Sequence, residues 1–525
     1  MTNQHLAGLL QEQLRAARAH TKSERVIRDK GTVIHVPGIG SSLSSAYEQL
    51  RNAAEYTEDH LVLQHAVRRF CGRNLPMATK RDIQDNFGEE LIIELTQAGY
   101  FANDLYSSAV ADRITTLART YTTAYWQMRE AGAGRDDVGE WLLDVVSVYA
   151  EEALNPHSHL TALAYVGYSH YSKLLPKQKF LRSEDSDEKA DYDICLYIAV
   201  HHTLLKSDRA LVRSDLLRLY RQGPQDLSAY VAFNKKIDRL LWSDLTRNLE
   251  RVVSRYGAPL RVLNSMAAVR DDLPELLKDR KLFMDEYMLH LARVYADLGK
   301  RLDAGLLKSI IFIFVTKMLI GLVVEIPYDL LVFGSVAVVP LLVNLLVPPL
   351  YMASLKLSLS HPTLANAEAV RAYMERALFT NEPPVAGAIR ALPRRMGTAA
   401  RIGYAIVFLV PLAVASTALY LLDFSFVQAI IFLMFLSTAS FLGFRLSRMV
   451  RDLELVSNDT GLLTAASDFF YLPFIMIGRW VSSKYAQVNV VARLLDLGIE
   501  LPLKSSLKLA RQWIKFIRDR QEEIY

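Results

Sequence analysis

Four long runs of apolar residues occupy the second half of the chain, at 306–324, 330–353, 402–422 and 424–444. Each run approaches the roughly 20 residues with which a helix crosses the ~30 Å core of a bilayer. Short polar stretches at 325–329 and around Asp423 join the runs in pairs. Because backbone polar groups cannot stay unpaired in hydrocarbon, the pattern predicts two antiparallel transmembrane hairpins, at 306–353 and 402–444.

The charges that flank these runs predict an orientation. The charged residues of both short turns are all acidic. The connector at 354–401 is basic, and Arg445, Arg448 and Arg451 follow the last run. The positive-inside rule then places the N-terminus, the connector and the C-terminus in the cytoplasm. Short turns, the absence of an N-terminal signal peptide and the low number of cysteines favour a bacterial inner membrane, with the membrane of a eukaryotic organelle as the alternative.

The first 300 residues have the pattern of a soluble helical region. Apolar residues recur every three or four positions, as at Ile237, Leu241, Leu245 and Leu249. The charged run at 183–193 is a natural point for dividing the region into two lobes. Only residues 32–36 resemble a strand, and one strand cannot form a sheet. The predicted fold class is therefore all-α: a large helical N-terminal cytoplasmic region, a four-helix transmembrane region of two antiparallel hairpins, and an amphipathic basic C-terminal tail.

The segment at 461–481 is apolar but interrupted. Asp468, Pro473 and Arg479 leave too few uncharged residues for a crossing, so a re-entrant or interfacial segment is predicted there.

In the tail at 482–525, apolar residues with helical spacing lie beside a basic stripe. The stripe predicts a helix on anionic lipid headgroups, and docking of the tail on the soluble region is the alternative. The predicted membrane-surface residues are Lys504, Lys508, Arg511, Lys515 and Arg518.

The distribution of charge and cysteine excludes some classes of function. After Lys300 the chain has 22 Lys and Arg against 16 Asp and Glu, so its positive excess lies in the apolar half. A nucleic-acid binder concentrates basic residues on its soluble domain, and no nucleic-acid partner is expected. Cys71 and Cys195 are far apart in sequence, which supports neither a disulfide framework nor a thiolate metal site.

Two sequence features in the N-terminal region are weak candidates for chemistry. Gly38, Gly40, Ser41 and Ser42 precede a predicted helix whose free amides could receive a phosphate, but the P-loop lysine is missing and a serine N-cap explains the pattern equally well. Around His201, four side chains at helical spacing could form a polar network or a metal site. They are Asp193, Tyr197, His201 and His202. We assign no catalytic residue, no metal ligand and no cofactor.

Lys317 is the most informative residue of the apolar runs, because it lies near the middle of the first one. A charge at that depth costs several kcal/mol unless it reaches the headgroups or finds a partner. Glu325, Asp329, Asp423 and Asp468 are the candidate counter-charges, with Asp468 a candidate only if its segment enters the bilayer.

Asn344 is the second polar candidate, and it shares its run with Pro340, Pro348 and Pro349. Prolines interrupt the backbone ladder, and broken helices line cavities in some transporters. A packing kink with a hydrogen bond from Asn344 across the hairpin is the simpler alternative.

Three hypotheses for function follow, and no motif in the chain identifies a family. The first is a membrane-anchored scaffold or partner-binding protein, with a protein partner or a second copy of the chain on its cytoplasmic domain. The second is a channel, transporter or lipid-handling protein that uses Lys317 and the proline-broken second run. The third is a membrane-bound enzyme, which ranks last because no residue set has catalytic spacing.

Overall fold

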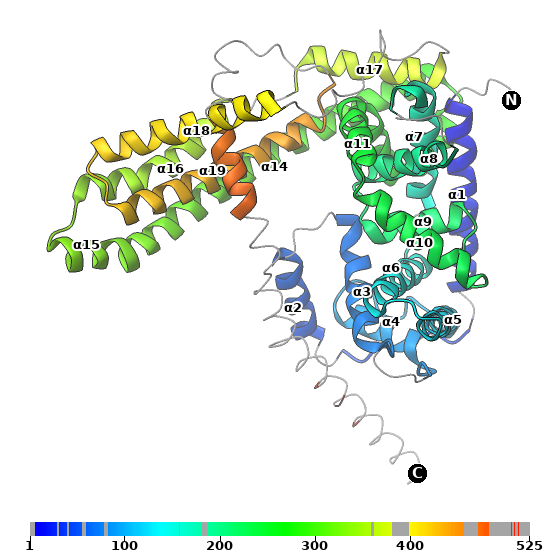
Figure 1. The fold of residues 1–525 in the computed structure, drawn as a ribbon. Coiled ribbons are helices and arrows are strands. Elements are labelled where there is room, and N and C mark those ends of the chain that lie inside the picture. The colour runs from blue at the N-terminus through cyan, green and yellow to red at the C-terminus, as the bar shows by residue number, and fades with distance from the viewer. Residues whose placement is uncertain are drawn as a thin grey trace. The chain divides into compact units, whose positions relative to one another are not determined.

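The computed structural model describes residues 6–28, 31–38, 41–54, 59–77, 82–156, 158–180, 186–358, 362–380, 398–455 and 471–481, with Ser506, Leu509 and Trp513. All regular elements of this part of the chain are helices (Figure 1). Val33 and Ser107 form an isolated antiparallel bridge, so the expected strand at 32–36 has a partner but builds no sheet. The all-α class is confirmed.

The chain divides into two compact units. Unit 1 comprises Met1–Val253, Asp271–Glu275 and Asn489–Tyr525, and unit 2 comprises Ser254–Arg270 and Leu276–Val488. The helices of unit 1 are α1 (Leu6–Arg28), α2 (Ser41–Ala54), α3 (Val62–Asn74), α4 (Phe87–Gln97), α5 (Ser108–Glu130), α6 (Arg135–Leu154), α7 (Ser158–Leu174), α8 (Ser186–Val200), α9 (Arg209–Leu219), α10 (Leu227–Leu241) and most of α11 (Asp244–Tyr256). A π-helical turn, His201–Leu205, ends α8.

Helix α6 lies at the centre of unit 1, where it packs against α3, α5 and α9. Its Trp141 is buried and donates a hydrogen bond to Asp238 at 2.7 Å. Arg213 of α9 is fully buried beside it and donates to Asp144 at 2.9 Å and to Asn234 at 2.8 Å. These charged groups inside unit 1 are paired, as buried charges in folded proteins generally are.

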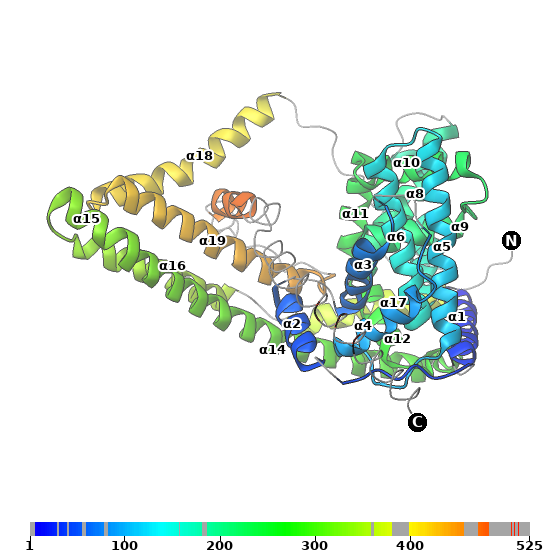
Figure 2. The ribbon, with the colours of Figure 1, turned by 90° about the horizontal axis from the view of Figure 1, so that it is seen from below.

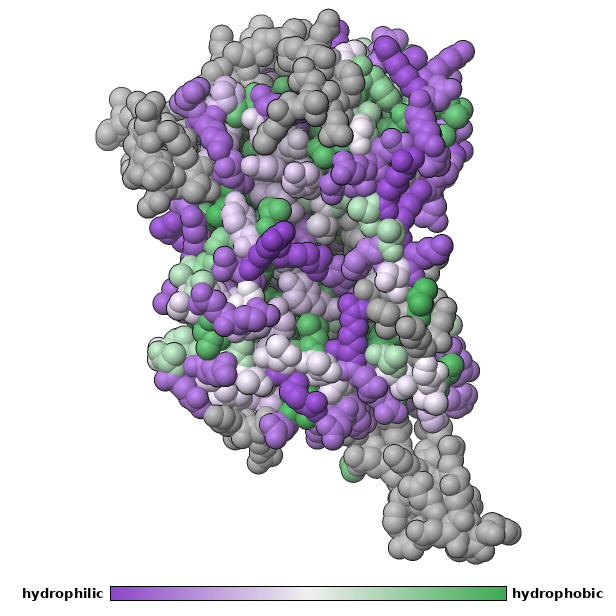
Figure 3. Space-filling model, turned by 90° about the vertical axis from the view of Figure 1, so that its right-hand side faces the viewer, coloured by the Kyte–Doolittle hydropathy of each residue, from purple (hydrophilic) through white to green (hydrophobic). Residues whose placement is uncertain are grey.

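One face of unit 1 is mainly hydrophilic. Figure 3 shows a face over its helices on which hydrophilic side chains predominate and hydrophobic ones are scattered. Scattered exposed apolar residues are normal for a soluble protein.

Unit 2 contains a second set of helices (Figure 2). They are α12 (Ala258–Val269), α14 (Arg280–Ile320), α15 (Ile326–Phe333), α16 (Val338–Ser358), α17 (Leu364–Phe379), α18 (Thr398–Leu421) and α19 (Phe426–Arg451). The short helix α13 (Leu273–Leu276) precedes α14, and residues 471–481 are also helical. Asp279 caps α14 by accepting from two backbone amides, and α14 then runs unbroken through residue 300 into the apolar sequence.

The turn of the first hairpin differs from the prediction. A π-helical turn, Gly321–Glu325, joins α14 to α15, so residues 325–329 are helical and buried at Glu325 and Asp329. Pro327 lacks an amide donor and its ring crowds the preceding turn, and the wider π turn accommodates it. The chain reverses after Gly334, which has a φ of 68°.

The predicted four-helix transmembrane region is not confirmed. Because the chain reverses at Gly334 and not at 325–329, the second apolar helix is shorter than predicted. Among the described residues, two helices are long and apolar enough to cross a membrane, the continuous run Arg280–Phe333 and Phe426–Arg451. The apolar parts of α16 and α18, Val338–Ser354 and Phe408–Leu421, are shorter. Residues 330–337, which the prediction gave to the second span, belong to the end of the first helical run and to the turn.

Three of the apolar helices pack together. Helices α14, α16 and α19 contact one another, and Leu306, Ile313, Met352 and Phe435 belong to their shared core. Figure 2 shows that α18 diverges from α19 beyond the turn at Asp423. The helices α18 and α19 are therefore joined by a turn, as predicted, but they pack less closely than α14 and α16 do.

A polar base lies at one end of unit 2. It consists of α12, α17, the first half of α14 and the end of α19. The amide of Asn366 in α17 donates to the Tyr295 hydroxyl at 2.8 Å and to the Leu453 carbonyl at 2.9 Å. Arg261 of α12 donates to the Asp452 carbonyl at 2.5 Å. The start of the first helical run and the end of α19 therefore lie on the same side of the apolar helices.

Candidate functional site

The apolar helices of unit 2 have an inverted distribution of side chains. Large apolar residues face outward along all of them, whereas the buried positions include charged and amide side chains. Examples of the exposed residues are Leu307, Phe312, Leu322, Leu331, Val339, Leu350, Leu409, Leu421, Phe426 and Met434. In water such a surface is unfavourable, because each exposed leucine or phenylalanine forgoes about 1.5–3 kcal/mol of burial free energy.

The centre of the buried polar cluster is an ion pair. Lys317 of α14 is 1% exposed and Glu325 of the π turn is 0% exposed, and the lysine Nζ lies 2.5 Å from the glutamate Oε1. The ammonium also lies 4.9 Å from the ring centroid of Phe435 on α19, within the range of a cation–π interaction. The positions are eight residues apart, about 12 Å along a regular helix, so the long lysine side chain extends along α14 toward the glutamate.

Asn344 connects this pair to α16. Its amide nitrogen lies 2.9 Å from both carboxylate oxygens of Glu325 and 3.4 Å from the backbone carbonyl of Gln428. Asn344 is fully buried, and its own oxygen has no partner among the described residues. The Glu325 carboxylate therefore joins α14 to α16, and the Asn344 amide extends the cluster to the start of α19.

Asp329 and Gln428 form the second half of the cluster. The Gln428 amide donates to Asp329 Oδ2 at 2.8 Å, and the backbone amide of Ala337 donates to the same oxygen at 3.4 Å. Gln428 also closes a capping box with Ser425 at the start of α19. Glu325 and Asp329 are one helical turn apart, which places both carboxyl groups on the buried face.

The structure brings together two of the three intramembrane candidates from the sequence, Lys317 and Asn344. The third, Asp468, lies outside the described residues. Glu325 is the partner of Lys317, and Asp423 lies exposed in its turn with a φ of 57°. Sequence reasoning did not find Gln428 as a cluster member, although a glutamine inside an apolar run was a visible signal.

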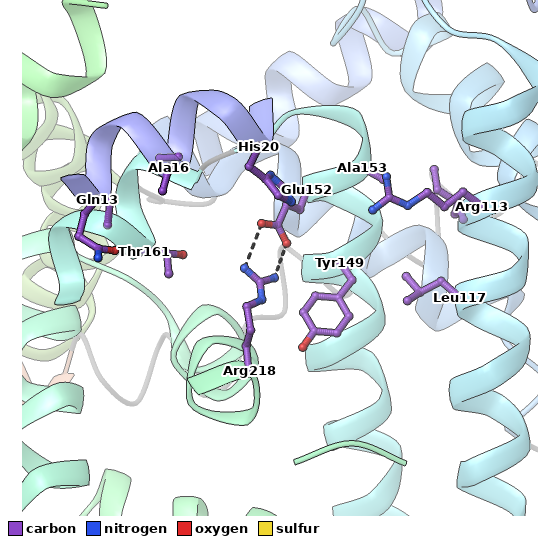
Figure 4. Close-up of a pocket in the computed structure, with 13 residues that line it drawn as sticks. Gln13, Ala16, His20, Arg113, Leu117, Tyr149, Glu152, Ala153, Thr161 and Arg218 are labelled. Carbon is purple, nitrogen blue, oxygen red and sulfur yellow. Dashed lines mark hydrogen bonds and ion pairs between the residues drawn. The ribbon is translucent and has the colours of Figure 1, made fainter. Parts of the chain in front are cut away.

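A pocket of about 480 Å³ in unit 1 is a second candidate site (Figure 4). Its lining comes from α1, α5, α6, α7 and α9. Helix α1 contributes Gln13, Ala16, Ala17 and His20, which share one face at helical spacing. Because two of these residues are alanines, the helix leaves space there, whereas Leu10 fills the core on an adjacent turn.

Besides Gln13 and His20, the polar groups of this pocket are Arg113, Glu152, Thr161 and Arg218, and Tyr149 lies beside Arg218 (Figure 4). Arg218 binds both carboxylate oxygens of Glu152 and lies 5.3 Å from the Tyr149 ring. Burial lowers the pKa of Arg218, but the Glu152 carboxylate outweighs it and the net pKa is raised. A mainly apolar cavity of this size with a few convergent polar groups fits a small amphipathic molecule.

The His201 group does not converge on one ligand. His201 lies 3.0 Å from the Ser207 hydroxyl and 3.3 Å from the Asp215 carboxylate, whereas His202 pairs with Glu250 at 2.6 Å. Asp193 pairs with Lys177 at 2.6 Å, and Tyr197 donates to Asp215 at 3.5 Å. Burial raises the pKa of Asp215, but His201 and Arg218 hold it below its ordinary value. No metal-binding group of acidic, histidine or cysteine side chains occurs among the described residues.

The phosphate-loop candidates and the tail are described in part. Ser41 begins α2, and its amide and hydroxyl both donate to the Gly38 carbonyl, at 3.3 and 2.8 Å. Ser42 is exposed on the first turn of α2, and Gly40 lies outside the described residues. The five basic residues of the predicted tail stripe also lie outside them, and the described Leu509 and Trp513 are exposed.

Comparison with family models, with curated proteins and with solved structures gives no match to this chain.

Proposed function

We propose that this protein is a membrane-anchored binding protein, in which the apolar helices of unit 2 lie in a bilayer and unit 1 binds a partner outside it. The observation that carries the proposal is the inverted side-chain distribution of unit 2, with leucine and phenylalanine outside and Lys317, Glu325 and Asp329 inside. Hydrocarbon is the solvent in which that arrangement is favourable.

The proposal retains four crossings as two hairpins, with α14–α15, α16, α18 and α19 as the membrane helices. Shorter apolar stretches are compatible with a bilayer that thins locally or with flanking basic side chains that reach the headgroups. The basic connector and the arginines at the end of α19 support a cytoplasmic base, and a bacterial inner membrane fits this orientation. The basic tail would lie on anionic headgroups of the same leaflet.

Two measurements test the membrane placement. The protein is expected to stay with membranes through alkaline carbonate extraction and to dissolve only in detergent. Reporter enzymes fused at Ser335 and Asp423 are expected to be active on the outer side, and a fusion at residue 380 on the cytoplasmic side. Extraction without detergent, or cytoplasmic reporters at both turns, contradicts the proposal.

Binding by unit 1 is supported by the pocket beside α1. Ala16 is exposed at its edge, so Ala16→Trp is expected to fill the pocket without disturbing the core. Ala19 is also exposed on α1 but does not line the pocket, which makes Ala19→Trp the matched control. Mass spectrometry of molecules released from gently purified protein is expected to show a ligand that Ala16→Trp loses and Ala19→Trp keeps.

Partner binding is tested in the same preparation. Stable co-purification of a protein with the full chain supports the anchor, and the stoichiometry distinguishes a foreign partner from a second copy. A preparation that contains neither a partner protein nor a pocket ligand contradicts the binding role.

Transport is the second candidate function, because the buried cluster of Lys317, Glu325 and Asp329 resembles the ionisable groups that mark ion pathways in membranes. The test is ion flux in vesicles that contain the purified protein. The charge-neutral double variant Lys317→Met with Glu325→Gln is expected to fold and to lose any flux. Absence of flux in the wild-type protein excludes this candidate.

A further inference from the structure

The polar cluster of unit 2 contains one more acidic than basic side chain. Lys317, Glu325 and Asp329 are its ionisable members, and each is at most 1% exposed. Lys317 pairs with Glu325, and Asp329 forms no ion pair with any described residue. Lys317 is the one basic residue of the sequence between Lys308 and Lys356, so this stretch of the hairpin offers Asp329 no further cation.

The neighbours of Asp329 cannot stabilise a full charge. Its Oδ2 accepts from the neutral Gln428 amide at 2.8 Å and from the Ala337 backbone amide at 3.4 Å. An uncompensated carboxylate in a low-dielectric interior costs several kcal/mol, and two neutral donors do not offset that cost. In addition, Glu325 lies one helical turn away on the same face, where like charges repel.

The two unpartnered atoms of the cluster are both acceptors, so the cluster is short of hydrogen-bond donors. Asp329 Oδ1 and Asn344 Oδ1 are buried in this cluster and have no hydrogen-bond partner. An ionised Asp329 only adds acceptors, whereas a protonated carboxyl group supplies one O–H donor. Gln428 is the cluster side chain that contacts Asp329, and Lys317 and Asn344 contact Glu325 instead. Of the four residues other than Asp329, only Lys317 and Glu325 are ionisable.

We propose that Asp329 is a proton-binding site: the folded protein carries one proton on the Asp329 carboxyl group, and the cluster is thereby neutral. This inference rests on the proposed membrane placement of unit 2. A proton on Oδ1 leaves Oδ2 as the acceptor for Gln428 and preserves the observed contact between α15 and α19. Loss of the proton would place an unpaired charge between these helices and α16, so proton exchange is coupled to their packing.

Infrared difference spectroscopy of the full chain in lipid nanodiscs at neutral pH tests the proton directly. The wild-type spectrum minus that of Asp329→Asn is expected to show the carbonyl stretch of one protonated carboxyl group. Asp423→Asn is the matched control, because Asp423 is exposed in a left-handed turn that asparagine also tolerates. That variant is expected to keep the band.

Thermal unfolding gives a second readout, because asparagine is close in shape to a neutral aspartic acid. Asp329→Asn is expected to keep the wild-type midpoint, whereas Glu325→Gln lowers it by leaving Lys317 unpaired. A missing band, or an Asp329→Asn midpoint as low as that of Glu325→Gln, overturns the proton site. Binding of radioactive sodium that Asp329→Asn abolishes overturns it in favour of a metal cation. Carbonate extraction reports separately on membrane placement, so the two proposals fail distinguishably.

Discussion

The buried pair of Lys317 and Glu325 allows a quantitative test of what holds the apolar helices together. Lys317→Met leaves the Glu325 carboxylate with only the Asn344 amide as a donor, and Glu325→Gln leaves the ammonium without a counter-charge. Breaking a buried ion pair by removing one member typically costs about 3–5 kcal/mol. A charge at the centre of a membrane helix costs roughly 2.5–3.5 kcal/mol on the insertion scale. We therefore expect each single variant to lose about 3 kcal/mol of stability.

The double variant tests the reasoning more sharply than either single change. With both charges removed, the helix interface keeps its volume and contains no unpaired ion, so most of the lost stability is expected to return. The two residues are in direct contact, and coupling energies between such neighbours commonly reach about 0.5–3 kcal/mol. A value near the upper end of that range is expected here.

The wild type, the two single variants and the double variant form a double-mutant cycle. Equilibrium unfolding in mixed micelles with increasing sodium dodecyl sulfate measures the free energy of unfolding of all four proteins. Lys300 and Asp297, also on α14, form an exposed ion pair at 3.8 Å and supply the control cycle. Exposed pairs contribute little, so no resolvable coupling is expected there. If the single variants at the buried pair unfold like the wild type, the ion pair does not stabilise the packing of the apolar helices and the reasoning is refuted.

Three further predictions concern pH, thiol chemistry and helix crossing. Burial lowers the pKa of His170 from 6.5 to about 4, so its stabilising effect is complete above pH 6.5 and is lost as the pH falls toward 4. At pH 5 the free energy of unfolding should be about 2 kcal/mol lower than at pH 8, and thermal scans of His170→Gln should show less of this loss. Burial also raises the pKa of Cys71 to about 12 and raises that of Cys195, so maleimide labelling at pH 8 should require denaturation; fast labelling of the native protein would contradict their burial. A Cβ on Gly478 would lie 2.2 Å from the Ser437 carbonyl oxygen, so Gly478→Ala should lower the thermal midpoint, whereas Gly403→Ala, with open space around it, should not; equal midpoints would contradict the close crossing.

The helical class and the presence of apolar helices in the second half of the chain could be predicted from the sequence, because both follow from local pattern. The spacing of apolar residues in the first 300 positions and the length of the later apolar runs need no knowledge of distant contacts. The same holds for Lys317 as a residue that needs a partner, since its cost depends on its place within one run. Glu325 was among the expected partners, and the structure selects it.

The end of the first helical run could not be read correctly from the sequence. Acidic residues and a proline at 325–329 are typical of a turn, and local propensity favours one there. The structure continues the helix instead, because Lys317 and Asn344 bind Glu325 and Gln428 donates to one oxygen of Asp329 inside the packed helices. Tertiary partners thus turned two expected surface acids into buried ones.

The pocket in unit 1 and the membership of Gln428 were also decided only in three dimensions. The residues that line the pocket lie between positions 13 and 218 of the chain. In the sequence, the alanines that leave this space open look the same as alanines on the surface of any helix. Sequence patterns report how one helix divides its faces between two environments. Which helices share a face, and therefore which polar groups meet there, depends on packing between segments far apart in the chain.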